Sequence, residues 1–228
     1  MMRTRMLDTQ VLLKQIALPL FLTRQNKYFY AALAFTVASF LYVASNHYPL
    51  FAPQQLPMHW IDQNTPFIPE TVWIYLSEYF LFLTVYFFCK DMVNANKYLY
   101  SFLALQTTSV LIFILWPTTY PRELFPLDSA SLDSWTFSIF NFLRQMDTPT
   151  NCCPSLHVSS VYLSTFVYLD DQRKKFPFFF TWGTLIALST LTTKQHYLID
   201  VVMGFAMAVI FYQIFHRYIP YRGVQAKR

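Results

Sequence analysis

The stretch TKQHYLIDVVMGFAMAVIFYQIF, residues 193–215, changes from polar to apolar directly after His196. From Val201 to Phe215 it contains no charged side chain. An α-helix needs about 20 predominantly apolar residues to cross the roughly 30 Å hydrocarbon layer of a bilayer. Tyr197–Phe215 is therefore predicted to be a transmembrane helix, with His196 at its entrance.

The composition of the whole chain fits the same environment. Of its residues 55% are hydrophobic, 20% aromatic and 13% charged, with only three glycines. Such a chain is too apolar and too poor in charge for an ordinary soluble domain. We predict an all-α membrane protein with six transmembrane helices, the fourth and fifth being the shortest. The predicted spans are Phe29–Ser45, Thr71–Cys89, Tyr98–Trp116, Ser155–Leu169, Phe178–Thr193 and Tyr197–Phe215.

The segment Val11–Leu22 is apolar but too short to span, with Lys14 inside it and Pro19 near its end. We interpret it as an amphipathic helix on the membrane surface. A cleaved signal is disfavoured because no small-residue cleavage site follows. The chain is accordingly divided into a cytoplasmic N-terminus (1–28), a transmembrane domain (29–217) and a basic cytoplasmic tail (218–228).

Lysine and arginine are distributed unevenly between the two sides that six spans create. Short loops rich in these residues stay on the cytoplasmic side. Fourteen of the seventeen fall on the side of the two termini, which we therefore predict to be cytoplasmic. The net charge of +5 then reflects topology and anionic lipid headgroups, and not a nucleic-acid partner. The fourteen are Arg3, Arg5, Lys14, Arg24, Lys27, Lys90, Lys97, Arg173, Lys174, Lys175, Arg217, Arg222, Lys227 and Arg228.

Three cations remain on the outer side: Arg122, Arg144 and Lys194. Each is an exception to the preference of lysine and arginine for the cytoplasmic side, and an anion bound by the residue is one explanation. The other is that a few exceptions arise by chance and that Arg144 pairs with Asp147 on a surface helix. For Lys194, two residues before His196, we favour the anion. The outer segments 47–70 and 117–154 are long and are expected to cover the site.

Both His157 and His196 fall on that outer side, each at the start of an inward-running helix. The first turn of a helix carries free backbone N–H groups and the positive end of the helix dipole, which favour a phosphate. Ser155, preceded by Pro154, suits such a start as a helix cap or a phosphate donor. The two histidines are therefore candidates for one phosphate site.

His196 and Asp200 are four residues apart and share one face of a helix. An aspartate that accepts the imidazole Nδ1–H fixes the tautomer, leaves Nε2 free to attack, and stabilises the charge that develops. This is the arrangement of an activated histidine nucleophile. Such pairs are also common as structural contacts, so the spacing alone leaves both interpretations open.

Glu78 lies within the second predicted span. A charge in the middle of a membrane costs several kcal/mol, so acidic residues there tend to be functional. A neutral, hydrogen-bonded core acid is the simpler interpretation of Glu78.

Pro154-Ser155-Leu156-His157 resembles the Pro-Ser-Gly-His motif of the type 2 phosphatidic acid phosphatase superfamily. Ser189, His196 and Asp200 match the spacing of the family's second histidine motif. The resemblance implies that His196 attacks phosphorus to form a phosphohistidine, that Asp200 orients it, and that His157 protonates the leaving oxygen. Catalytic residues are thus expected at His196, Asp200 and His157.

The chain departs from the family pattern at the phosphate-binding cations. Thr190 replaces an arginine, Leu115 replaces a lysine, and Leu156 replaces the motif glycine. Loss of that arginine also resembles the sphingomyelin synthase and inositol phosphorylceramide synthase branch, which implies headgroup transfer to an alcohol.

We expect other residues to hold the phosphate instead. The expected phosphate-binding residues are Arg122, Lys194 and Ser155, with Arg144, Thr190 and Ser189 as secondary site residues.

The predicted function is a membrane lipid phosphatase or phosphotransferase that acts on a lipid phosphate or diphosphate. Headgroup transferase activity is one alternative, and a non-catalytic protein that binds anionic lipid is another. We expect no cofactor and no metal, because His47 and His59 lie without an acidic cluster at ligand spacing. The site is expected to face the periplasm from a bacterial inner membrane, although a eukaryotic lumenal site has the same sidedness.

Overall fold

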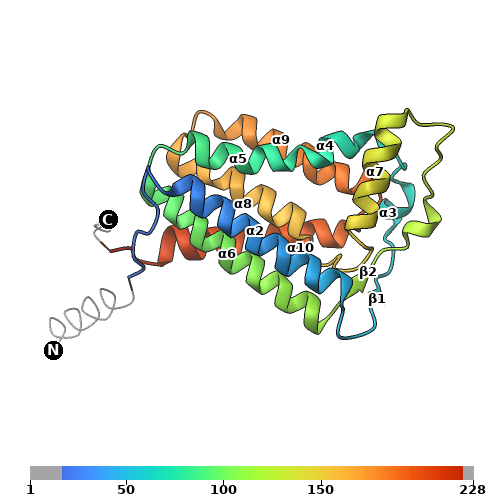
Figure 1. Ribbon diagram of the computed structural model, residues 1–228, viewed down its shortest axis with the longest axis horizontal. Helices are drawn as coiled ribbons and strands as arrows, with labels where there is room; N and C mark the ends of the chain where they lie inside the picture. The colour runs from blue at the N-terminus through green and yellow to red at the C-terminus, as the bar shows by residue number, and fades with distance from the viewer. Residues whose placement is uncertain (1–16, 223–228) are drawn as a thin grey trace.

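The computed structural model describes residues 17–222, which form a helical bundle with short elements over one end (Figure 1). The second predicted span is divided between α4 and α5, and the last continues beyond α10 as a π-helical turn. All six predicted spans coincide with helical segments. These segments are α2 (Lys27–His47), α4 (Val72–Leu76), α5 (Glu78–Phe88), α6 (Met92–Leu115), α8 (Leu156–Asp171), α9 (Phe176–Thr192), α10 (Leu198–Gln213) and η3 (Ile214–Tyr218).

Four of the described helical segments are long and apolar enough to cross a membrane. α9 is apolar but shorter, and α8 has only 16 residues. The helical fold and four candidate membrane spans are therefore confirmed, whereas six crossings stay a prediction. The four long segments are Lys27–His47, Pro69–Phe88, Met92–Leu115 and Leu198–Tyr218.

α8 forms the centre of the bundle and packs against α5, α6, α9 and α10. Every residue from Val158 to Tyr168 is buried. Polar side chains in this stretch are paired inside the protein: Ser164 Oγ donates to the Ser160 carbonyl at 2.8 Å and lies 2.8 Å from the Tyr98 hydroxyl. Since α8 faces other helices instead of lipid, it tolerates serine and threonine where a lipid-facing helix would not.

Two glycines let neighbouring helices approach α8 closely. A Cβ at Gly204 of α10 would lie 2.5 Å from the backbone carbonyl oxygen of Ser155. A Cβ at Gly183 of α9 would lie 2.9 Å from the Thr165 Cγ2 methyl. Close contacts through small residues are typical of helices packed within membranes. Gly204 therefore fixes the approach of α10 to the beginning of α8.

Gly204→Ala should lower both thermal stability and activity, and by more than Gly183→Ala. The new methyl at position 204 meets backbone, which cannot rotate away, whereas at position 183 it meets side-chain methyls. We expect destabilisation of about 1–3 kcal/mol for Gly204→Ala, as for overpacked cores. Thermal melting of the two purified variants in one detergent provides the measurement. Equal melting temperatures for wild type and Gly204→Ala would contradict the close approach.

The predicted N-terminal surface helix, Val11–Leu22, lies partly outside the described residues. Its described part, 17–22, is not helical and contains an isolated bridge between Leu18 and Tyr221, so the prediction is wrong there. The backbone N–H of Leu18 donates to the Pro220 carbonyl at 3.0 Å, and that of Arg222 donates to the Leu18 carbonyl at 2.9 Å. Pairing with the C-terminal segment replaces helical hydrogen bonds, and Pro19 has no N–H to contribute to a helix.

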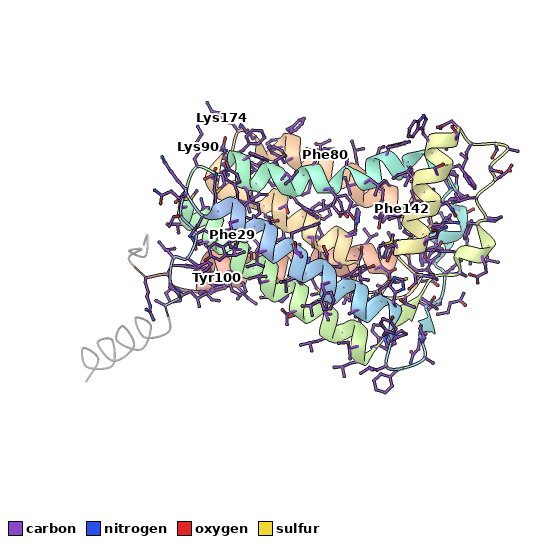
Figure 2. All side chains as sticks on the ribbon, viewed as in Figure 1. Phe29, Phe80, Lys90, Tyr100, Phe142 and Lys174 are labelled. Carbon is purple, nitrogen blue, oxygen red and sulfur yellow. The ribbon has the colours of Figure 1, made fainter. Side chains whose placement is uncertain are left out.

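The opposite end of the bundle is covered by the two long connecting segments predicted to lie there (Figure 1). One contributes α3 and the other contributes α7, and a short parallel pair of strands joins them. Lys90 and Lys174 lie at the end away from this cover, while Phe29 and Phe80 project from the sides of the bundle (Figure 2). The elements of the cover are β1 (Gln54–Gln55), α3 (Trp60–Asn64), η1 (Pro69–Thr71), β2 (Thr118–Thr119), η2 (Arg122–Leu124) and α7 (Ser134–Met146).

Candidate active site

A cavity of about 600 Å³ lies beneath the cover, between α2, α5, α6, α7 and α8. Most of its wall is apolar, with Phe35, Phe80 and Phe142 among the lining residues. His157 and His196 both line it. The structure thus brings the two predicted histidines to one chamber, whose apolar part suits a lipid tail.

His196 is held by the loop between α9 and α10. The backbone N–H groups of Gln195 and His196 both donate to the Thr190 carbonyl, at 3.0 and 3.3 Å. His196 Nδ1 lies 3.0 Å from the Cys152 carbonyl oxygen and 3.3 Å from Asp200 Oδ2. Both neighbours are acceptors, so Nδ1 carries the proton and Nε2 presents its lone pair.

Asp200 is fully buried, and the same oxygen that faces His196 also accepts from the Tyr197 backbone N–H at 2.9 Å. The carboxylate therefore caps the first turn of α10 and orients the imidazole at the same time. The predicted pairing of His196 with Asp200 is present in the structure.

His157, in the first turn of α8, has a carboxylate partner of its own. Its Nδ1 lies 2.8 Å from Glu78 Oε2, and the exposed fractions of the two side chains are 6% and 8%. The Tyr75 ring stacks on the imidazole with a centroid distance of 3.9 Å. His157 Nε2 is buried and has no hydrogen-bond partner among residues 17–222. Glu78 could be selected from the sequence as an acidic residue within a predicted span. Its partner, His157, is known only from the packing of α5 on α8.

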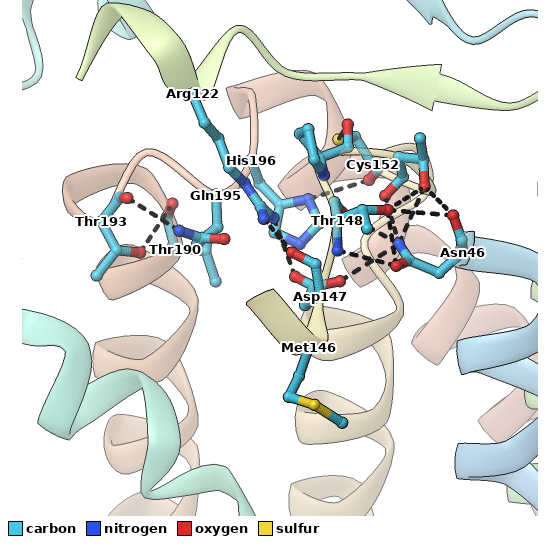
Figure 3. A network of polar contacts seen from close by, with 12 residues as sticks. Asn46, Arg122, Met146, Asp147, Thr148, Cys152, Thr190, Thr193, Gln195 and His196 are labelled. Carbon is cyan, nitrogen blue, oxygen red and sulfur yellow. Dashed lines mark hydrogen bonds and ion pairs between the residues drawn. The ribbon is translucent and has the colours of Figure 1, made fainter. Parts of the chain in front are cut away.

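Arg122 lies beside the cavity without lining it. Its Nη2 is 2.9 Å from Asp147 Oδ2, and its Nη1 donates to the Asp147 carbonyl. Figure 3 shows this side chain reaching toward Asp147, which lines the cavity together with His196. Burial, the largest single effect, lowers the pKa of Arg122, but the charge and hydrogen bond of Asp147, together with Cys152 and Tyr75, raise it by more, so the pKa lies above its ordinary value. Arg122 is therefore a permanent cation close to the site.

Asp147 is the partner of Arg122 and not, as one interpretation had it, of Arg144. Arg144 Nη1 donates to the Phe125 carbonyl at 2.8 Å, and its guanidinium lies over the Phe140 ring at 4.8 Å. Burial, with the charge of Arg122, lowers the pKa of Arg144 to about 10. Arg144 thus supports the cover and does not line the cavity.

Lys194 does not reach the cavity either. Its Nζ donates to the carbonyls of Asp62 and Thr65, at 2.8 and 2.6 Å, and lies 4.9 Å from the centroid of the Phe125 ring. The residue has a φ of 54°, and its side chain reaches the α3 region. Lys194 therefore links the loop between α9 and α10 to the outer segment that contains α3.

The other residues predicted for the phosphate site, Ser155, Ser189 and Thr190, form side-chain hydrogen bonds with backbone groups. Ser155 Oγ accepts from the Val158 N–H at 3.2 Å, which makes it the cap of α8. The hydroxyls of Ser189 and Thr190 donate to carbonyls one turn back in α9, at 2.6 and 2.7 Å. At the start of α10, Asp62 Oδ1 accepts from the Leu198 N–H at 2.7 Å. The helix ends expected to hold phosphate are thus already capped by side chains.

The cysteines and the potential metal ligands of residues 17–222 are further candidates for chemistry, and the three cysteines are buried and free. Burial, followed by the charge of Asp200, raises the pKa of Cys153 to about 12, so this thiol stays protonated. Burial raises the pKa of Cys152 as well. Among residues 17–222, no group of three or more metal-ligating side chains is clustered.

Comparison with known proteins identifies the family of the chain. A family model described as the PAP2 superfamily matches residues 43–214, a range that contains both histidines and their carboxylate partners. No curated protein matches the chain. Since the family model covers most of the chain, the protein belongs to the PAP2 superfamily.

Proposed function

We propose that the protein is a membrane enzyme that transfers the phosphoryl group of a lipid phosphate through a phosphohistidine at His196. Members of the PAP2 superfamily are phosphoesterases and phosphotransferases, which sets the class of reaction. The observation that carries the proposal is that two histidines, each bound through Nδ1 to a buried carboxylate, line one largely apolar cavity.

In the first step His196 Nε2 attacks phosphorus, and the bond between phosphorus and the lipid oxygen breaks. His157 donates the proton from its Nε2 to that oxygen as it leaves. Glu78 favours the doubly protonated imidazolium that can make this donation, as Asp200 stabilises the charge that develops on His196. Arg122, which pairs with Asp147 at the cavity wall, contributes positive charge to the phosphoryl transition state.

In the second step a hydroxyl group attacks the phosphohistidine and His196 is regenerated. Water yields free phosphate, whereas a lipid alcohol yields a new phospholipid. The apolar wall near the histidines suits a second lipid, and Thr190 replaces a cation. Both features support headgroup transfer as the second candidate.

The same proposal places the active site at the non-cytoplasmic face and the termini in the cytoplasm. It is supported by the cations at the far end of the bundle, including Lys90 and Lys174 (Figure 2). A bacterial inner membrane with the site facing the periplasm fits this arrangement, with the bilayer and a lipid phosphate as partners.

The experiment that tests the function supplies purified protein in liposomes with lipids radiolabelled at phosphorus. Free phosphate identifies a phosphatase, and label in a new lipid identifies a transferase. If neither product forms from phosphatidic acid, phosphatidylcholine or polyprenyl diphosphate, while the protein still binds them, the chain is a lipid-binding member without catalytic activity.

Glu78→Gln should lower turnover by about 10- to 100-fold, part of the 10²–10⁴ that general acid catalysis contributes. Glutamine can still accept from His157 Nδ1 but no longer stabilises the imidazolium. The loss should therefore be large for a lipid alkoxide leaving group and small for an aryl phosphate, whose phenolate leaves without a proton. Turnover of both substrates is the measurement.

Glu70→Gln is the matched control, because Glu70 is exposed in η1. It should leave both substrates unaffected. Equal losses on the two substrates in Glu78→Gln would show that Glu78 acts on stability or binding and not through proton donation.

A further inference from the structure

Polar side chains line the cavity at two depths. The histidines mark the outer level, and Gln106 of α6 with Ser160 of α8 forms an inner pair. Ser160 follows His157 by three residues, so it lies about 4.5 Å deeper along α8. The aromatic residues Phe35, Phe82 and Phe102 line the same chamber.

The inner pair retains unused hydrogen-bonding capacity. Gln106 Nε2 donates to Ser160 Oγ at 3.0 Å, and this is the side-chain hydrogen bond that each makes among residues 17–222. The amide oxygen, the second amide N–H and the serine hydroxyl proton are left over. The two residues are 7% and 2% exposed. Buried polar groups without partners are costly, so the pair suits a polar ligand group at this depth.

We propose that Gln106 and Ser160 bind the polar linkage of the substrate lipid. The inference rests on the proposed function and deepens it, because it specifies the substrate class. The substrate carries an ester, amide or hydroxyl group a few bonds from phosphorus, as in a glycerol or sphingoid backbone. A carbonyl oxygen accepts from the Gln106 amide or the Ser160 hydroxyl, and a hydroxyl donates to the Gln106 oxygen.

Polyprenyl phosphates lack such a group, since their chain is hydrocarbon from the first carbon after the phosphate. Binding one would leave the Gln106 amide and the Ser160 hydroxyl unpaired beside apolar chain. Sites built to hydrogen-bond a substrate reject analogues that lack the matching group for this reason. The inner pair therefore selects lipids by the chemistry next to their headgroup.

The test compares Gln106→Leu and Ser160→Ala with wild type on three substrates: phosphatidic acid, ceramide 1-phosphate and undecaprenyl phosphate. We expect kcat/KM for the first two to fall about tenfold, the scale of one or two net hydrogen bonds. The value for undecaprenyl phosphate should stay unchanged or rise. Thr107→Val is the control, because Thr107 is exposed on the same helix. If kcat/KM falls for phosphatidic acid alone, the substrate has a glycerol backbone. If it falls for ceramide 1-phosphate alone, the substrate has a sphingoid backbone.

Binding is measured in parallel, with the same substitutions placed in the His196→Ala background. Displacement of a fluorescent lipid by each of the three lipids gives affinities that do not depend on turnover. Selective weakening for the two backbone lipids supports the inference even if no product forms, which separates it from the proposed function. Equal weakening for all three lipids, or none, overturns it and makes the pair a helix contact only.

Discussion

Replacing His196 with alanine is expected to abolish product formation, by about 10⁴-fold or more, as when other covalent enzymes lose their nucleophile. Acid-labile label on the protein should vanish with it, because Nε2 of this ring is the proposed attachment point of phosphorus. Brief exposure to a labelled lipid phosphate, followed by acid and alkaline stability tests of the bound label, is the measurement. Lipid binding should persist, since the cavity walls remain.

His47→Ala is the matched control. His47 is exposed at the covered end and does not line the cavity, and its Nε2 lies 3.0 Å from the carbonyl of Met146. It should retain label and turnover. Alkali-stable, acid-labile label that survives His196→Ala would assign the nucleophile to another residue, with His157 the next to test.

Asp200→Asn should lower kcat by about 10²–10⁴ with KM nearly unchanged. Asparagine still accepts from the Tyr197 N–H and caps α10, so the fold around the site is retained. It cannot stabilise the positive charge that develops on His196. KM should hold because Asp200 does not line the cavity. Steady-state kinetics with a melting curve for each protein separates the two effects.

The same substitution at Asp128, an exposed residue of the outer segment, should leave kcat at the wild-type value. If Asp200→Asn raises KM without lowering kcat, the carboxylate contributes to substrate binding, and the orienting role is wrong. A lower melting temperature with normal kcat would show that Asp200 only caps α10 and has no role in orienting His196.

Most of the fold could be predicted because hydrophobic length and the distribution of cations act locally along the chain. The predicted spans required no knowledge of neighbouring helices, and each coincides with a helical segment. α8 is less apolar than the other predicted spans because its serines face neighbouring helices. No local sequence pattern shows which residues surround them. The non-helical structure of segment 17–22 was missed because its partner, Pro220–Arg222, is about 200 residues away.

The roles of the outer cations could not be predicted from their side of the membrane. Lys194 stands two residues from His196, yet its φ of 54° turns Nζ to the carbonyls of Asp62 and Thr65. Arg122, some 70 residues earlier in the chain, pairs with Asp147, which lines the same cavity as His196 (Figure 3). Proximity in sequence to His196 did not indicate where the Lys194 side chain lies, because backbone dihedrals decide where a long side chain points.

The sequence by itself determined the helical membrane architecture and the His196–Asp200 pair, since both depend on spacing within single helices. Only the tertiary structure decided that Glu78 meets His157 and that Gln106 meets Ser160. Each of these contacts joins two helices, and their geometry depends on how closely α5 and α6 pack on α8. Helix packing is set by the summed shape of many side chains, so it cannot be derived from any one motif.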